Sequence, residues 1–389
     1  MADRTESAPM TDRPAISRPI AALPFWMSLG LVPCVWLAAT RGGWSLVLVP
    51  IYGWILLPIL DVLFGLNRDN PDTDTPEADL FWHRFITLIW LPLQAAILYG
   101  AIWWATATDA LMLWEKLALF GGIGIISGAV GIVYAHELMH QKNPTERWLA
   151  DLLLALVLYS HYRTEHLLVH HRYVGTPRDA VSAPYNENFH RFFLRVLSEG
   201  PGSAWRAERQ MLARAGRTVF HRSNPFWRYG ALMALAAGLA LIIGGWLGLG
   251  LFALQALVAV WQLELVDYIE HYGLTRKYLG DGKYEHVRPH HSWNAAHRAT
   301  NWFLINLQRH SDHHCKPDRR FPLLQTYAAD AAPQLPYGYP VMTALALVPP
   351  LWLRVMNPRV RAWRRQFYPE ISDWSDYRER RLPSPKGAS

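Results

Sequence analysis

Long apolar runs constrain this chain more than any other feature of its sequence. Six runs carry almost no charge: Ala22–Ala39, Trp44–Leu66, Ile86–Ala105, Leu117–Ala135, Tyr229–Gly244 and Trp246–Ile269. At a rise of about 1.5 Å per residue, each can cross roughly 30 Å of hydrocarbon as an α-helix, the fifth only marginally. The sequence therefore predicts an all-α integral membrane protein with about six transmembrane helices. Asp61, inside the second run, is expected to face protein or water rather than lipid.

The basic residues predict how these helices are oriented. Of 38 Lys and Arg residues, all but Arg41 and Lys116 lie outside the six runs and their outer loops. Positive charge gathers on the cytoplasmic side of membrane proteins. We therefore expect both termini on the cytoplasmic side of a bacterial inner membrane. This orientation also explains the net charge of +7, and with no recognisable nucleic-acid motif we expect no nucleic-acid partner.

The runs divide the chain into consecutive parts. We expect a disordered tail at 1–20, four transmembrane helices at 21–135, a cytoplasmic block at 136–228, two further helices at 229–270, a second cytoplasmic block at 271–360 and a C-terminal tail at 361–389. Within the second block, the apolar stretch Tyr339–Met356 is interrupted by Pro349 and Pro350, and we expect a membrane-surface helix there. The final residues, from Arg378, are expected to be disordered.

Nine of the 17 histidines lie in four short stretches in these blocks or at their edges. They are His136, His140, His166, His170, His171, His271, His310, His313 and His314. Because side chains three or four residues apart share a helix face, the pairs 136/140, 166/170, 310/313 and 310/314 are each expected to converge on one point. Nine imidazoles are too many for one metal ion and suit two. The cytoplasmic blocks are therefore predicted to form a histidine-rich helical metal site.

The nature of the metal depends on the whole set of histidines. The stretch His136-Glu137-Leu138-Met139-His140 alone is the pattern of a zinc protease with Glu137 as general base. The other histidines argue against that class, because a catalytic zinc needs about three protein ligands. Two ions held by imidazole suit redox chemistry with O2, but imidazole also binds copper and zinc. Cys315 is either an additional thiolate ligand or, as we favour, a small packed residue.

Four motifs resemble those of the membrane-bound alkane 1-monooxygenases, which belong to the integral-membrane, histidine-rich diiron class together with fatty-acid desaturases and xylene monooxygenase. They are the stretches 136–140, 165–171, Asp-Tyr-Ile-Glu-His-Tyr-Gly-Leu at 267–274 and Leu-Gln-Arg-His-Ser-Asp-His-His at 307–314. Pro289–Asn294 also matches, and we expect His290 and His291 in it to be structural or to support the ligands. Asp267 stands where the family often has Asn, and Cys315 where it usually has a small residue.

The resemblance implies an activity and its cofactors. It implies O2-dependent terminal hydroxylation of medium- to long-chain n-alkanes to 1-alkanols by two iron ions, with electrons from rubredoxin, itself reduced by a rubredoxin reductase. It assigns the nine histidines as ligands, divided four and five in a way that the sequence does not specify. The alternatives are a xylene-type monooxygenase, a fatty-acyl desaturase or hydroxylase, a membrane zinc protease and a metal carrier.

Residues around the ligands are also predicted. Ligating histidines usually donate their second N–H to a carboxylate or carbonyl, and the candidates are Glu137, Glu165, Asp179, Glu264, Glu270 and Asp312. A substrate tunnel from the membrane lipid is expected along the helix face below His136, formed by Ile125, Gly128, Ala129 and Ile132, with Trp54 as a possible gate. Helix packing explains these small residues equally well.

A basic rim is expected to dock an acidic rubredoxin. It consists of Arg147, Arg163, Arg172, Arg178, Lys316, Arg319 and Arg320. The cytoplasmic orientation by itself would also account for these charges.

Overall fold

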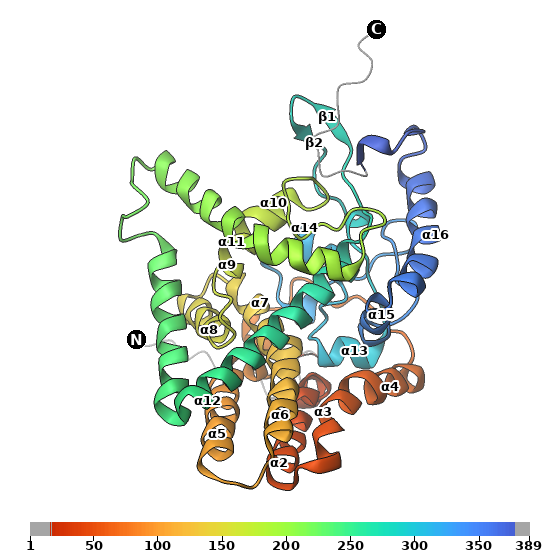
Figure 1. Cartoon of the computed structure of the whole chain (residues 1–389). Helices are drawn as coiled ribbons and strands as arrows, with labels where there is room; N and C mark the ends of the chain where they lie inside the picture. The colour runs from red at the N-terminus through yellow and green to blue at the C-terminus, as the bar shows by residue number, and fades with distance from the viewer. Residues whose placement is uncertain (1–15, 17, 378–389) are drawn as a thin grey trace, which may run out of the picture.

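Helices form nearly all of this structure, a computed structural model that describes residue 16 and residues 18–377. Its described strands form one short antiparallel hairpin, β1 (Tyr278–Gly280) and β2 (Lys283–Tyr284), shown in Figure 1. The predicted all-α architecture is confirmed. Most of the tail expected at 1–20, and the segment expected to be disordered from residue 378, lie outside the described residues.

Among the described residues, five helical runs are long and apolar enough to cross a membrane. The first is Pro19–Arg41, made of α1 (Pro19–Ala22), η2 (Leu23–Gly30) and α2 (Leu31–Arg41). The second is Gly43–Phe64, made of η3 (Gly43–Val47), α3 (Leu48–Ile51), η4 (Tyr52–Leu56) and α4 (Leu57–Phe64). The others are η5 (Glu77–Leu80) with α5 (Phe81–Ala107), then α6 (Leu113–Ile126) with η6 (Ser127–Ile132) and α7 (Val133–Met139), and finally α12 (Pro225–His271).

The last run, α12, contains the two helices expected at 229–244 and 246–269. Its 47 residues would extend about 70 Å if straight, far more than one bilayer crossing. Gly245 interrupts it with non-helical angles (φ 59°, ψ −156°), in the left-handed half of the map that glycine adopts without strain. The two arms run in opposite directions in Figure 1, so α12 is a hairpin of two helices.

Asp61, the acidic residue inside the second apolar run, is satisfied by protein contacts. Asp61 is only 6% exposed and accepts hydrogen bonds from the backbone N–H (2.9 Å) and the hydroxyl of Thr300, at the start of α13 (Arg298–Phe303). The expectation that Asp61 faces protein or water rather than lipid is confirmed. Its carboxylate attaches the second run to α13, which lies just before the last histidine motif in the chain.

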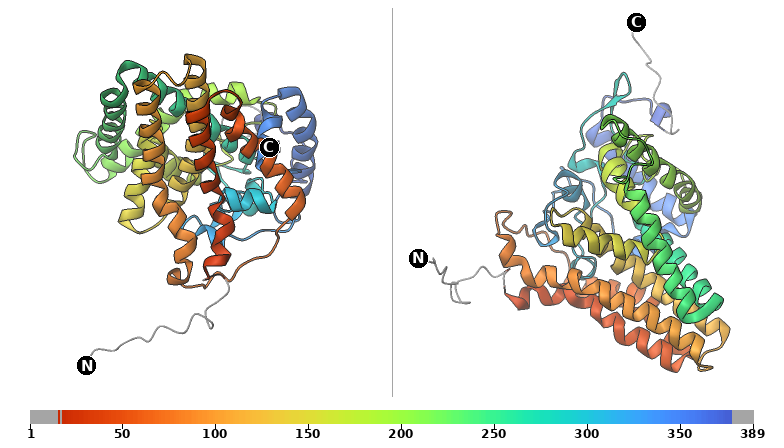
Figure 2. Two further views of the ribbon diagram at one scale, coloured as in Figure 1. Left: turned by 90° about the horizontal axis from the view of Figure 1, so that it is seen from below. Right: turned by 90° about the vertical axis from the view of Figure 1, so that its left-hand side faces the viewer.

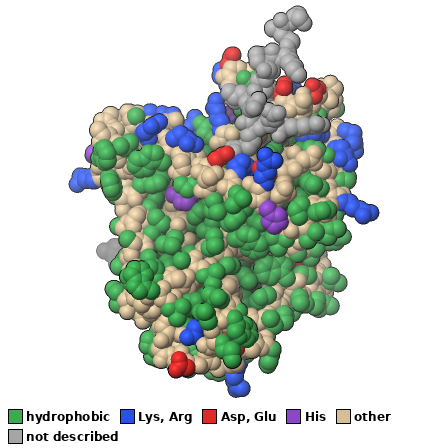
Figure 3. Space-filling view, viewed as in Figure 1, with side chains coloured by type: hydrophobic (Ala, Val, Ile, Leu, Met, Phe, Trp, Pro, Cys, Tyr) green, Lys and Arg blue, Asp and Glu red, His purple; other side chains and the backbone are tan. Residues whose placement is uncertain are grey.

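The rest of the chain covers one end of the apolar helices (Figures 1 and 2). It contains α8 (Pro144–Ala155), α9 (Tyr162–Thr164), η7 (Glu165–His170), α10 (His171–Tyr173), α11 (Phe189–Arg214), η8 (Pro289–His291), α13, α14 (His310–Cys315), η9 (Phe321–Leu323), α15 (Tyr339–Ala346), α16 (Pro349–Phe367) and η10 (Ser375–Tyr377). Figure 3 shows apolar side chains over the lower body of the molecule and most Lys and Arg side chains of that face near this upper end.

The single membrane-surface helix expected over Tyr339–Met356 is instead two helices. Helices α15 and α16 are bent by 119° at the break before Pro349. Helix α16 also continues to Phe367, past residue 360, where we expected the tail to begin. It does so because Val360 and Trp363 are buried in the core.

Candidate metal centre

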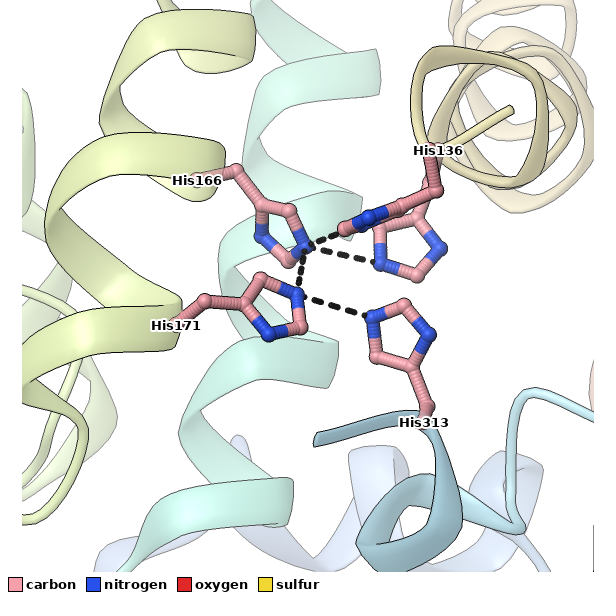
Figure 4. Close-up of side chains that lie close together, drawn as sticks. His136, His166, His171 and His313 are labelled. Atoms are coloured by element: carbon pink, nitrogen blue, oxygen red, sulfur yellow. Dashed lines mark hydrogen bonds between the residues drawn. The ribbon is translucent and has the colours of Figure 1, made fainter. Parts of the chain in front are cut away.

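The fold brings all nine histidines together in two groups. One group has five members, His136, His140, His166, His171 and His313, and the other has four, His170, His271, His310 and His314. Within each group, the ligand atoms lie within 4.8 Å of one another. Figure 4 shows four members of the larger group pointing inward from three separate segments.

The π-helical turn η7 decides how three of these histidines are divided. A π-helix forms i→i+5 rather than i→i+4 hydrogen bonds, so residues five apart lie on one face. His166 and His171 accordingly meet, with their Nε2 atoms 2.9 Å apart. His170 joins the other group. The expectation that His166 and His170 converge on one point is therefore wrong.

Helix α14 also supplies both groups. His310 and His314 lie one turn apart and their Nε2 atoms are 3.0 Å apart. His313 points instead toward His171, with 3.1 Å between the two Nε2 atoms. The expected convergence of His310 with His313 is wrong, because His313 lies about 100° around the helix from His314, which shares a group with His310. The adjacent pairs 170/171 and 313/314 thus each divide between the groups.

Six of the nine imidazoles are neutral, which is the protonation state that metal binding requires. For these six histidines, all outside the apolar runs, burial lowers the pKa, and neighbouring imidazoles lower it further. This holds for His140, His166, His171, His310, His313 and His314, whose pKa values are all well below 6.5. Each ring is therefore neutral at pH 7 and keeps a lone pair for a ligand bond.

Asp179 prepares His170 in particular. Its carboxylate lies 3.0 Å from His170 Nδ1 and so favours the tautomer in which that nitrogen donates. Burial alone would raise the pKa of Asp179, but His170 and Ser182 lower it to about 2. The opposite nitrogen, His170 Nε2, is buried and has no hydrogen-bond partner among the described residues. An unpaired buried nitrogen costs free energy unless something binds it.

The donor set fits metal ions. Nitrogens bound to one ion at about 2.0–2.1 Å would lie roughly 3.0–3.4 Å apart. Within the groups, the closest Nε2–Nε2 distances are 2.9–3.1 Å. The donors are all imidazole nitrogens, which suit iron, copper and zinc.

The other predicted carboxylates contact different parts of the site. Glu270 Oε1 lies 3.2 Å from His310 Nδ1 and accepts a hydrogen bond from the Tyr339 hydroxyl at 2.8 Å. Glu264 accepts instead from Tyr159 Oη at 2.8 Å. Both oxygens of Glu165 are buried with no partner among the described residues.

Two of the expected supporting carboxylates hold backbone and neighbouring side chains rather than ligands. Glu137 accepts from the Gln141 side chain at 3.0 Å and from the Phe321 backbone N–H at 3.4 Å. Asp312 accepts from Arg319 at 2.6 Å, from the Gln325 backbone at 3.0 Å and from the Tyr327 hydroxyl at 3.0 Å. Both residues therefore fasten loop 319–327 to ligand-bearing helices.

His290 and His291 belong to a hydrogen-bond network with Glu285 and Tyr368. The Tyr368 hydroxyl lies 3.1 Å from His290 Nε2 and 2.7 Å from His291 Nε2, and it donates to Glu285. The backbone N–H of Arg288 donates to His291 Nδ1 at 2.9 Å. A neutral His291 must then carry its proton on Nε2, which leaves that nitrogen no lone pair for a metal. Glu285, His290 and His291 also lie close enough together to hold an ion, but this tautomer of His291 favours hydrogen bonding instead, and the expectation that both histidines are structural or support the ligands stays a prediction.

An apolar cavity leads to both histidine groups. The five residues expected in a tunnel, Trp54, Ile125, Gly128, Ala129 and Ile132, all line it, and so do His136 and His310, one from each group. Gly128 also serves packing, because a Cβ there would lie 2.7 Å from the Ala259 carbonyl oxygen. Gly128 thus both lines the cavity and allows close helix packing, and its role in a substrate tunnel stays a prediction.

Sequence reasoning missed several cavity residues. Tyr162, Phe303, Tyr339 and Thr343 line the cavity from segments outside the matched motifs. Thr343 accepts a hydrogen bond from the Trp54 indole N–H at 3.3 Å. Nearly 300 residues separate this pair, so no local pattern indicates it.

The predicted basic rim is reduced by ion pairing. Arg163 pairs with the buried carboxylate of Asp151, and Arg319 with that of Asp312. Arg320 pairs with Glu146 and Glu77. Among the described carboxylates, none is within salt-bridge distance of Arg147, Arg172, Arg178 or Lys316.

Comparison with known proteins agrees with this architecture. The fatty acid desaturase family model matches residues 109–346. Alkane 1-monooxygenase 2 of Pseudomonas aeruginosa is 39% identical over 349 residues, which cover 88% of this chain and 89% of the relative. Alkane 1-monooxygenase of Pseudomonas putida is 36% identical, over 87% of this chain and 84% of the relative. The xylene/toluene monooxygenase hydroxylase component of Pseudomonas putida is 27% identical over 80% of this chain and 82% of the relative. The chain therefore belongs to the alkane 1-monooxygenase family, within the wider fatty acid desaturase family.

Proposed function

We propose that this protein uses O2 to hydroxylate the terminal methyl of medium- to long-chain n-alkanes, giving 1-alkanols at a centre of two iron ions. The observation that carries the proposal is the apolar cavity that ends at His136 of one histidine group and His310 of the other. An alkane in this cavity would present one end to both groups. The five-histidine and four-histidine groups would each hold one ion.

Iron, when bound, would supply O2 activation and the oxidising power for the C–H bond. The residues of the chain bind and orient the alkane. Ile132, Val133 and Leu307 line the cavity and lie three or four residues before His136 or His310 in the chain. They would exclude water and hold the methyl group in place. Asp179 orients the His170 ring, and Glu270 lies beside His310.

The orientation and the electron donor complete the proposal. The basic end of the molecule, which contains the histidines, would face the cytoplasm of a bacterial inner membrane. Alkanes would enter from the lipid side and electrons would arrive from rubredoxin, reduced by its reductase. Two cysteines cannot form a four-cysteine iron site, so these 389 residues do not themselves hold the iron of a rubredoxin.

The test is metal analysis of the purified protein, together with turnover of octane, hexadecane and xylene. About two irons per chain and 1-alkanol as the main product are expected. Preferred oxidation of xylene would identify the xylene-type activity instead. Peptide cleavage with zinc bound would refute the proposal, and metal binding without turnover of any of the three substrates would leave a metal carrier as the function.

A further inference from the structure

The nine histidines are not equally shielded from solvent. Eight are buried, but His171, the first residue of α10, is partly exposed. Its Nε2 lies 2.9 Å from His166 Nε2 and 3.1 Å from His313 Nε2. His171 is thus the member of the two groups where the surface comes closest to the centre.

Two arginines without a salt bridge to any described residue follow His171 in the chain. Arg172 and Arg178 are both exposed, and their guanidinium carbons lie 5.2 and 5.5 Å from the centre of the Tyr173 ring. This cation–π stacking holds the two charges together at the surface. Arg163, Arg319 and Arg320, in contrast, are neutralised by carboxylates. Within the predicted rim, Arg172, Arg178, Arg147 and Lys316 therefore have no carboxylate within salt-bridge distance among the described residues, and Arg172 is the one that directly follows His171 in the chain.

A groove continues from this patch. Its lining includes Val169, Tyr173 and Arg178 on one side and Glu199, Ser203 and Arg206 of α11 on the other, so one carboxylate lies among the arginines. Arg206 is exposed and adds a third positive charge. In Figure 1, α10 lies near the end of the molecule opposite the apolar lower body, which favours a soluble partner over lipid headgroups.

We infer that Arg172, Tyr173 and Arg178, at the edge of the α10–α11 groove, form the docking surface for a small acidic electron-transfer protein, and that electrons enter through His171. The inference rests on the proposed function. Each docking event would oxidise the carrier by one electron and reduce the centre by one. Two such events, with two protons and O2, convert one alkane to one alkanol and one water.

Charge reversal tests this surface. With purified rubredoxin as the probe, Arg172→Glu and Arg178→Glu should each raise the KM for rubredoxin about tenfold, because reversing a rim charge slows association. The kcat at saturating rubredoxin and the bound iron should stay unchanged. Arg222→Glu is the matched control, since Arg222 is exposed in the loop between α11 and α12, and its KM should not change.

Two further measurements separate the possible failures. Turnover driven by a small uncharged reductant should be the same in all variants, because it needs no docking surface. A rubredoxin with one surface acid reversed to Lys should restore the KM of Arg178→Glu. An unchanged KM in both variants, or an equal rise in Arg222→Glu, would overturn the docking surface. A lack of alkanol with every reductant would instead refute the proposed function.

Discussion

Replacing Ala129 by Phe should shorten the longest alkane that the enzyme accepts. Ala129 lines the cavity seven residues before His136 (136 − 129 = 7), roughly 10 Å along the helix axis. An extended alkyl chain advances about 1.25 Å per carbon, from C–C bonds of about 1.5 Å and near-tetrahedral angles. The new ring would therefore meet the chain near the eighth carbon. Ile126, ten residues before His136, lies near the twelfth by the same arithmetic.

The size of the effect follows from packing. Forcing a chain past an added aromatic ring costs about 1–3 kcal/mol, as overpacking does in protein cores, which corresponds to about 5- to 150-fold in kcat/KM. Dodecane should suffer this loss, while hexane should stay within about threefold of the parent enzyme. Ala129 suits the test better than Gly128, since Gly128 contacts the α12 backbone closely.

The assay is kcat/KM for hexane, octane, decane and dodecane, with product identified by chromatography. Ala118→Phe is the matched control, because Ala118 is exposed on α6 of the same apolar run. It should leave the chain-length profile unchanged. A ratio of dodecane to hexane activity that is the same in Ala129→Phe and the parent enzyme would refute the role of this cavity.

Three further predictions concern the metal centre. Asp179→Ala should weaken metal binding at the four-histidine group by about 10- to 100-fold. The control Asp318→Ala removes an exposed acid paired with Lys142 and should not weaken it. Equal metal retention in both variants, measured by titration with metal analysis, would contradict the role of Asp179. Glu137→Gln should keep its iron and most of its activity, because Glu137 contacts Gln141 and Phe321; loss of turnover with full iron occupancy would show that Glu137 acts in the chemistry. The metal-free protein should lose stability below pH about 6.5. Its buried histidines have lowered pKa values, so the unfolded chain binds more protons, at up to about 1.4 kcal/mol per pH unit for each histidine. A melting temperature that stays flat from pH 7 to 5.5 would contradict this reasoning.

Much of the fold can be predicted from local sequence. Apolar runs of bilayer length must form helices in lipid, because every backbone group needs an internal partner. The glycine pair Gly244 and Gly245, between the fifth and sixth apolar runs, likewise marks the turn of the α12 hairpin. The nine histidines can be selected because their spacing is local. Pro349 and Pro350 mark where α15 and α16 are separated, but the extent of α16 was missed, since it depends on the burial of Val360 and Trp363.

The sequence by itself determined which side chains are available for a metal centre, because residue types and short spacings are written in the chain. Only the tertiary structure decided how they are divided. The π turn of η7 pairs His166 with His171, and α14 sends His313 and His314 to different groups. It also decided that Asp179 meets His170 while Glu137 and Asp312 hold a loop. These outcomes depend on where separate helices meet, and a helical spacing rule carries no information about that.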